Sequence, residues 1–246
     1  MLGLGNSITS ASYTGGLDLS GFSMAFDASN ADGLPQIGLT FTETHFAIAG
    51  STLSFAFWAK VESASNLYNV FGDTGSDANS FFKRISIDGS QITKKLVMES
   101  NTNGNEMSAT ISLDTNWHHY VITTDGSGGY DMYQDGSALL KASVSIGNKI
   151  SIDSIGAGGN AFRFDGLLFQ CAIWDAELDA DAVSAIYNSG TPIPLQEDKG
   201  NYDNSGDLIH LWRFAEGSGS TSEDSVCNLN GTLQPAASFS TTTPYS

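Results

Sequence analysis

Cysteine and histidine are scarce in this sequence, and their scarcity excludes a class of metal protein. The chain has two cysteines, Cys171 and Cys227, and four histidines in 246 residues, which leaves no ligand cluster for a zinc site. Cys171 lies inside an apolar run, where a thiol behaves as a small hydrophobic side chain, so two free thiols are favoured over a disulfide. A chain of this length buries enough surface to fold without cross-links.

Basic residues are also scarce. Ten Lys and Arg stand against 27 Asp and Glu, which gives a net charge of −17 at pH 7. This charge repels phosphate backbones and anionic lipid headgroups, so no nucleic-acid partner and no membrane insertion are expected. The sequence also lacks an apolar run near the roughly 20 residues of a membrane span. Its start lacks the basic and apolar regions of a secretory signal, so assembly in a cytoplasm is expected.

The motifs of common catalytic sites are absent. The chain has no G-x-S-x-G elbow, P-loop, H-E-x-x-H or complete EF-hand loop. His118 and His119 are neighbours, and neighbours in a strand point to opposite faces, so the two cannot bind one ion together. His45 and His210 are single strand residues for which the sequence offers no partner. We therefore predict no enzyme activity and no required cofactor.

Short β-branched and aromatic runs fill residues 22–174, with turn dipeptides about every ten residues. The dipeptides are Asp32-Gly33, Asp88-Gly89, Asn103-Gly104, Asp125-Gly126, Asp135-Gly136 and Asp165-Gly166. Such pairs favour type I′ hairpin turns, whose two central residues need positive φ. Within one run the apolar residues alternate: Leu53, Phe55, Phe57, Ala59 and Val61. These features predict an all-β fold, an antiparallel sandwich of two sheets.

One short helix is expected near residue 180. Asp179 is a suitable N-cap, and Leu178 and Val183 occupy the two positions of a hydrophobic staple. Gly190 and the pair Thr191-Pro192 should end the helix.

The run before this helix has the pattern of a central strand. Residues 167–174 are apolar on both faces apart from Gln170, as in a strand that is covered on each side. A buried amide without partners costs about 1–3 kcal/mol. We therefore expect Gln170 to form a hydrogen bond with a neighbouring loop.

Composition divides the chain into five segments. They are an N-terminal arm at 1–20, a sandwich at 21–190, a surface connection at 191–206, C-terminal strands at 207–235 and a tail at 236–246. The fourth segment has one clear strand, which is too little for a separate sheet. It is therefore expected to complete the sandwich or to exchange into a neighbouring subunit.

Four segments together resemble the laminin G-like jelly rolls of the concanavalin A-like lectin superfamily, of the pentraxin type. They are residues 22–33, 51–61, 116–136 and 162–190, the last with the family's strand-helix pattern. A block at 208–233 is similar to the segment that ordinarily opens such a domain. The whole arrangement resembles virion-associated proteins of tailed bacteriophages, marine ones especially. The resemblance implies a concanavalin A-like jelly-roll sandwich in a virion protein that is assembled in the host cytoplasm.

The resemblance implies a non-enzymatic structural protein of a phage particle, either a head decoration or a tail-associated module. Its partners would be capsid or tail proteins and a cell-surface glycan, and it would form a homo-oligomer on the particle. One alternative is a carbohydrate-binding lectin for host recognition. Another is a glycoside hydrolase, whose carboxyl groups must converge on the sugar bond. The nearest string, Glu177, Asp179 and Asp181, opens a helix, so its side chains should fan apart.

Calcium is the metal that the resemblance suggests, because many relatives bind it through oxygen ligands. The acidic pair that relatives carry is replaced here by Phe169 and Gln170. Asp27, Asn30 and Asp32 remain as candidate calcium ligands. The alternative is an Asx-rich turn that satisfies its own backbone.

A sugar site in such lectins would pair an aromatic ring with Asp and Asn side chains. The candidate glycan contacts are Tyr68, Tyr130, Tyr133 and Trp212. Each has core packing as an alternative, and the sequence does not choose among them.

Overall fold

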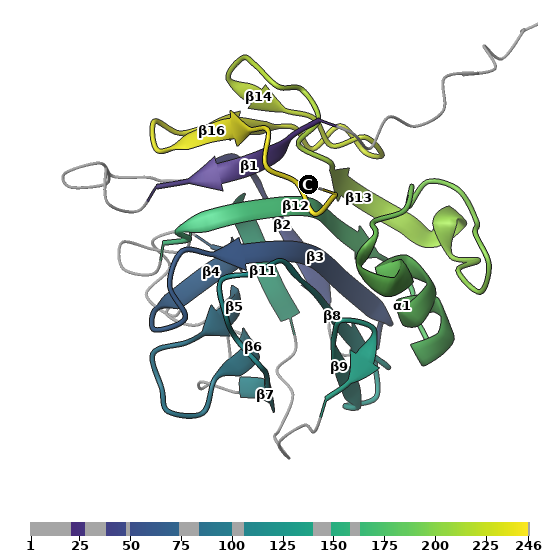
Figure 1. The fold of residues 1–246 in the computed structure, drawn as a ribbon. Coiled ribbons are helices and arrows are strands. Elements are labelled where there is room, and N and C mark those ends of the chain that lie inside the picture. The colour runs from purple at the N-terminus through teal and green to yellow at the C-terminus, as the bar shows by residue number, and fades with distance from the viewer. Residues whose placement is uncertain are drawn as a thin grey trace, which may run out of the picture.

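The computed structural model describes residues 21–27, 38–47, 50–73, 84–99, 106–139, 149–157 and 163–245. Two antiparallel sheets pack against each other as a sandwich, with one α-helix among the described residues (Figure 1). The predicted all-β, two-sheet architecture is confirmed. The N-terminal arm at 1–20 and the turn dipeptides Asp32-Gly33 and Asn103-Gly104 lie outside the described residues.

Sheet A has the strand order β10-β9-β8-β3-β12-β1-β16, and β13 also pairs with β12. Its strands are β1 (Ser23–Phe26), β3 (Leu53–Val61), β8 (His118–Thr124), β9 (Tyr130–Gln134), β10 (Ser137–Ala138), β12 (Gly166–Trp174), β13 (Leu208–Trp212) and β16 (Ala237–Ser240). Sheet B has the order β14-β15-β2-β11-β4-β5-β6-β7. Its strands are β2 (Leu39–Ala47), β4 (Leu67–Gly72), β5 (Arg84–Asp88), β6 (Lys95–Glu99), β7 (Glu106–Thr110), β11 (Lys149–Ile155), β14 (Thr221–Ser222) and β15 (Gly231–Leu233).

The period of two in β3 places its apolar side chains in the core between the sheets. Leu53, Phe55, Phe57, Ala59 and Val61 are all buried there, as predicted. The opposite face of β3 is covered too, because Ala56 packs in a second apolar layer beneath α1 (Ala180–Tyr187).

β12 is a central strand, as predicted, and the strand that pairs with one of its sides changes near Gln170. On one side β12 pairs with β3; on the other it pairs first with β1 and then with β13. Gln170 has a φ of 46° at a shift of the β12–β3 register. Its buried amide donates to the carbonyl of Ile193 at 2.9 Å. The expected hydrogen bond to a neighbouring loop is therefore confirmed.

The helix α1 begins where its N-cap signal predicted. The Asp179 carboxylate accepts a hydrogen bond from the N–H of Ala182 at 2.8 Å, and Leu178 and Val183 are both buried. The helix ends at Asn188, in the left-handed region with a φ of 46°, and a 3₁₀ turn, η2 (Asn188–Gly190), follows. Across the described part of the chain, no helix has the length and apolar character needed to span a bilayer.

The C-terminal segments add strands to both sheets within this single chain. β13 pairs with β12, β15 with β2, and β16 with β1. The segment expected as a tail at 236–246 therefore contains an ordered strand. The connection at 191–206 is also partly internal, because Tyr202 is fully buried and its hydroxyl donates to the Leu195 carbonyl at 2.7 Å. A further 3₁₀ turn, η3 (Ser205–Asp207), leads into β13.

One of the described Asx-Gly pairs has the backbone of a type I′ turn. Asp135 and Gly136, between β9 and β10, have φ values of 52° and 73°, as a type I′ turn requires. Asp88, Asp125 and Asp165 do not have positive φ, so their glycine pairs form other turns. Both cysteines are free thiols, as predicted, Cys171 buried and Cys227 exposed.

Candidate functional site

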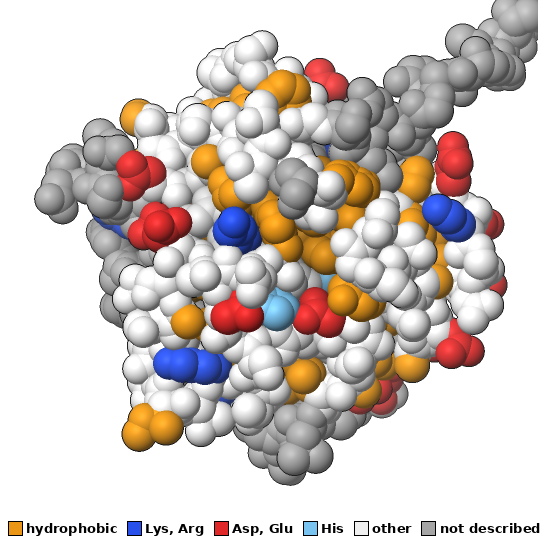
Figure 2. Space-filling view, in the orientation of Figure 1, with side chains coloured by type: hydrophobic (Ala, Val, Ile, Leu, Met, Phe, Trp, Pro, Cys, Tyr) orange, Lys and Arg blue, Asp and Glu red, His pale blue; other side chains and the backbone are white. Residues whose placement is uncertain are grey.

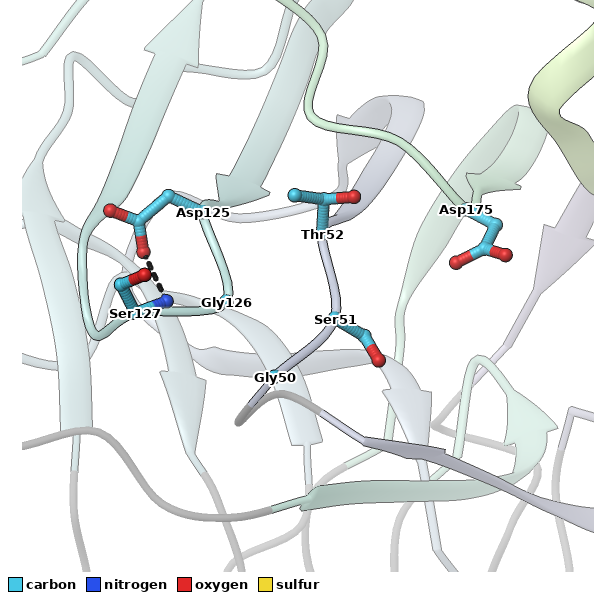
Figure 3. Close-up of a pocket in the computed structure, with 7 residues that line it drawn as sticks. All are labelled: Gly50, Ser51, Thr52, Asp125, Gly126, Ser127 and Asp175. Carbon is cyan, nitrogen blue, oxygen red and sulfur yellow. Dashed lines mark hydrogen bonds between the residues drawn. The ribbon is translucent and has the colours of Figure 1, made fainter.

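Three neighbouring strands of sheet A, β3, β8 and β12, have ends that lie side by side and frame a polar hollow. Leu53 at the start of β3 pairs with Thr124 at the end of β8, and Ser54 pairs with Trp174 at the end of β12. Because the register aligns these ends, the adjoining loops lie side by side. They line a hollow of about 430 Å³, formed by Gly50, Ser51, Thr52, Asp125, Gly126, Ser127 and Asp175 (Figure 3).

Backbone donors hold one carboxylate of this hollow in place. Asp125 Oδ1 accepts hydrogen bonds from the N–H of Ser127 at 2.7 Å and of Gly129 at 2.8 Å. These bonds lower the pKa of Asp125, so the carboxylate is charged at neutral pH. The N–H of Gly50 donates to the carbonyl of Gly126 at 2.8 Å, which ties the Asp125 loop to the loop before β3.

The lining is rich in hydrogen-bonding groups and has one sign of charge. Asp125 and Asp175 lie on opposite sides of the segment that carries Ser51 and Thr52 (Figure 3). Ser127 adds a third hydroxyl, and none of the described residues that line the hollow is Lys, Arg or aromatic. Carboxylates and hydroxyls of this kind can accept hydrogen bonds from a neutral polyhydroxylated ligand, whereas an anionic ligand would be repelled.

A second hollow, of about 540 Å³, lies on the outer face of sheet A, where β1, β12 and β3 run together. Ala25, Leu167 and Lys60 stand in one row across these strands. The carboxyl-bearing residues around it are Asp27, Glu62 and Asp165, and Ser240 and Thr242 close its other side. Figure 2 shows this face, on which charged side chains border a hydrophobic band.

Comparison with known proteins identifies the family of this sandwich. A family model described as the concanavalin A-like lectin/glucanases superfamily matches residues 36–184. The chain belongs to this superfamily. The search of curated proteins finds no match.

Solved structures of low sequence identity show the same lectin-like fold. The native heptameric SAP-like pentraxin of Limulus polyphemus aligns with a TM-score of 0.50 and 18% identity, over 89% of this chain and 98% of the pentraxin. A protein of Bacteroides ovatus titled a "putative carbohydrate binding protein" aligns with a TM-score of 0.52 and 13% identity, over 90% of this chain and 60% of that protein. At these identities the likeness extends to the fold alone.

The four aromatic residues considered as glycan contacts are buried in this lectin fold. Tyr68, Tyr130, Tyr133 and Trp212 are at most 6% exposed. Tyr68 packs on Phe164 in the core. Of the two alternatives that the sequence left open at these four positions, the structure shows core packing, and none of the four rings is exposed to a glycan. The loop residues of the polar hollow were missed because Ser, Thr and Gly near turns carry no signal of which loops meet.

The candidate calcium ligands are only partly described. Asp27 lies at the second hollow, whereas Asn30 and Asp32 lie outside the described residues. Among the residues whose placement is described, no group of three or more His, Cys, Asp or Glu side chains is arranged to hold a metal ion.

The acidic string lies at the start of α1, as expected. Asp179 caps the helix, and Glu177 and Asp181 are exposed on either side of it.

The adjacent histidines lie in different surroundings, as predicted. His119 is buried against Trp58, with ring centroids 4.8 Å apart, and against Tyr187. Burial lowers the pKa of His119 to about 3, so its ring is neutral. His118 instead contacts two carboxylates, Asp135 through Nδ1 at 2.7 Å and Asp114 through Nε2 at 3.1 Å. Since Asp135 sits in the hairpin turn beyond β9, only the β8–β9 register brings it to His118.

The structure gives His210 a partner that the sequence did not reveal. Its Nδ1 lies 2.8 Å from Oδ2 of Asp224, which is buried. An isolated antiparallel β-bridge between Trp212 and Asp224 brings His210 and Asp224 together, and nothing in the sequence spacing marks this pairing. The side chain of His45 lies outside the described residues.

The His118 contacts predict a pH-dependent stabilisation. The hydrogen bond with Asp135 raises the pKa of His118 above 6.5, in spite of burial. A raised histidine pKa adds stability that is fully present below about pH 6.5 and is lost as the pH rises through the folded-state pKa. We expect the difference in unfolding free energy between wild type and His118→Gln to shrink as the pH rises above about 6.5. Urea titrations at each pH measure it, and a difference that does not change with pH would contradict the assignment.

Proposed function

We propose that this chain is a non-enzymatic structural protein of a phage particle, a head decoration or a tail-associated module, that contacts a cell-surface glycan. Its lectin-like sandwich would dock on neighbouring capsid or tail proteins after assembly in the host cytoplasm. The observation that carries the glycan contact is the polar hollow between β3, β8 and β12. The particle context is supported by the sequence arrangement, which resembles that of tailed-phage virion proteins.

The chemistry of the hollow favours a neutral or amine-bearing sugar. Sugar hydroxyls donate well to carboxylates, and the carboxylates of Asp125 and Asp175 stand at its two sides. Hydroxyls of Ser51, Thr52 and Ser127 can both donate and accept. Because the described lining residues include two carboxylates and no cation, acidic sugars would be repelled there.

A binding role rather than hydrolysis is supported by the arrangement of the carboxylates. A glycosidase needs two carboxyl groups that flank one sugar bond, one of them protonated. Asp125 is stabilised in its charged form by two backbone donors, and the segment with Ser51 and Thr52 separates it from Asp175. Incubation of any bound oligosaccharide with the protein should therefore leave it uncleaved.

Removal of one carboxylate should weaken glycan binding. Asp175→Asn is expected to reduce the affinity for the best neutral oligosaccharide on a glycan array about tenfold, because a hydrogen bond to a charged acceptor contributes roughly 1.5 kcal/mol. Calorimetric titration measures this change. Asp181→Asn is the matched control, since Asp181 is an exposed carboxylate on α1 outside the hollow. Absence of any array signal, or equal affinity for both variants, would contradict a glycan site here.

The particle context has its own test. Mass spectrometry of purified virions should find the protein at a fixed copy number, and electron cryomicroscopy should place it on the head lattice or on the tail. A protein that binds glycans but is absent from particles would instead favour the free lectin.

A calcium titration tests the candidate ligands Asp27, Asn30 and Asp32. If those side chains bind calcium in the native state only, the melting temperature must rise with calcium concentration by mass action. The proposed function needs no cofactor, so glycan binding should persist in a chelating buffer.

A further inference from the structure

In the described part of the chain, the edge strands of the two sheets differ in how they are protected from pairing with another chain. β13, which pairs with β12 off the main path of sheet A, is bridged on its other side by Asp224 and Ser225. Natural proteins blunt an edge strand by making it very short or by placing charges on it. β10 (Ser137–Ala138) and β14 (Thr221–Ser222) have two residues each. β7 carries Glu106, which pairs with Lys95 at 3.2 Å. β16 (Ala237–Ser240) is longer than two residues and has neither a charge nor a proline.

The outward backbone groups of β16 can be assigned from its pairing with β1. The N–H of Asp27 donates to the carbonyl of Ala236 at 3.0 Å. Inward-bonded residues alternate along an antiparallel pair, so Ser238 and Ser240 also bond to β1. Ala237 and Phe239 then direct their backbone groups away from the sheet. The N–H of Ala237 already donates to Gln234 at 2.8 Å, which leaves its carbonyl and both polar groups of Phe239 facing outward.

The chain around this edge is uncharged, although the molecule as a whole is strongly acidic. No Asp, Glu, Lys, Arg or His occurs from residue 225 to residue 246, in a chain of net charge −17. Two copies that approach by other acidic surfaces repel each other, whereas the repulsion is smallest where this segment is at the contact. The occupant that this edge suits is therefore a second copy of the same chain.

We infer that β16 is a homotypic docking edge, through which two copies pair their sheets A antiparallel about a two-fold axis at Ser238 (Figure 1 shows β16 beside β1 at the rim of sheet A). In this register the N–H of Phe239 in each copy donates to the Ala237 carbonyl of the other, so the contact is self-complementary. The two Ser238 side chains face each other as a non-hydrogen-bonded pair. The dimer does not depend on the proposed glycan contact.

A cross-link tests the register directly. Residues opposite each other in a non-hydrogen-bonded pair have Cβ atoms about 4.5–5.5 Å apart, close to the separation that a disulfide needs. With the exposed Cys227 replaced by Ser, Ser238→Cys should form a disulfide-linked dimer under mild oxidation. Ser137→Cys, on the opposite edge strand β10 and also at an exposed position, should stay largely monomeric on non-reducing gels.

A charged substitution on β16 tests the same edge in solution. Ser238→Lys places two ammonium groups opposite each other across the axis, and its dimerisation should be at least about tenfold weaker than that of wild type. Ser137→Lys, the matched change on β10, should dimerise as wild type does. Sedimentation velocity over a concentration series measures both. Added salt should strengthen the wild-type dimer, since screening reduces the repulsion between the acidic bodies.

Two results would overturn the inference. One is a wild-type protein that stays monomeric at every concentration, at both low and high salt. The other is a dimer that Ser238→Lys leaves intact, as an exchange of β16 between copies would produce, because that exchange preserves the β16–β1 pairing. Circular dichroism of each variant establishes that it is folded.

Discussion

Replacing Asp224 with Ala should lower the melting temperature by about 10 °C, because it removes a buried acceptor that serves several donors at once. The Asp224 side chain accepts hydrogen bonds from His210 at 2.8 Å and from the N–H of Leu211 at 3.0 Å, and it also bonds the N–H groups of Val226, Cys227 and Leu229. The truncation leaves these donors without their acceptor inside the fold. The expected loss in unfolding free energy is about 3–5 kcal/mol, measured by denaturant titration.

The stability that Asp224 contributes should depend on pH. Burial tends to raise the pKa of Asp224, but the hydrogen bonds from His210 and the backbone outweigh it and lower the pKa to about 2. A depressed carboxyl pKa adds stability that is present above the unfolded value of 3.8 and is lost as the pH falls through the folded value. The Asp224→Ala variant should therefore show a weaker acid dependence of stability than wild type below about pH 4.

A matched surface change separates the buried network from a general charge effect. Asp203 is exposed on the connection before β13, so Asp203→Ala changes the net charge equally. Its melting temperature should stay within about 2 °C of wild type, as surface substitutions usually do. Equal melting temperatures for the two variants would show that the Asp224 contacts do not hold the C-terminal segment in place.

The second large effect is expected from Gly166→Ala at the start of β12. Gly166 has a φ of 139°, and a Cβ there would collide with the Lys60 carbonyl oxygen and lie 3.0 Å from the Cα of Val61. Both obstacles are backbone atoms of the paired strand β3, so no side chain can rotate away. We expect a loss of roughly 3 kcal/mol or more in unfolding free energy, measured by denaturant titration.

Two other glycines provide graded controls for this prediction. Gly206 has open space around its Cβ position and no positive φ, and Gly21 has open space but a φ of 146°. Gly206→Ala should be nearly neutral, and Gly21→Ala should show only the conformational cost of about 1 kcal/mol. If Gly166→Ala lost no more stability than Gly21→Ala, the close approach of β12 to β3 would not be the cause.

Much of the fold could be predicted because its signals are local. The alternation in β3 depends on residues two positions apart, and the start of α1 depends on Asp179 and the N–H of Ala182 three positions later. The need of Gln170 for a partner follows from its place in an apolar run. The partner itself, the Ile193 carbonyl, is set by the packing of a loop on β12.

The roles of the aromatic residues could not be predicted from the sequence. Tyr and Trp side chains occur both in sugar-binding sites and in protein cores. The burial of Tyr68 and Trp212 in the structure distinguishes these two roles. Burial depends on which strands lie in front of a side chain, and that is a property of the whole sandwich.

The amino-acid sequence determined the two-sheet architecture, the helix and its cap, the acidic charge and the uncharged C-terminal stretch. Only the tertiary structure decided that the loops at Ser51, Asp125 and Asp175 line one hollow, that His210 meets Asp224, and that β16 lies at an edge. The physical reason is the sequence separation between the residues that interact. Turn chemistry and alternation act between near neighbours, whereas strand order and register bring together residues far apart in the chain, through many weak contacts that no short motif encodes.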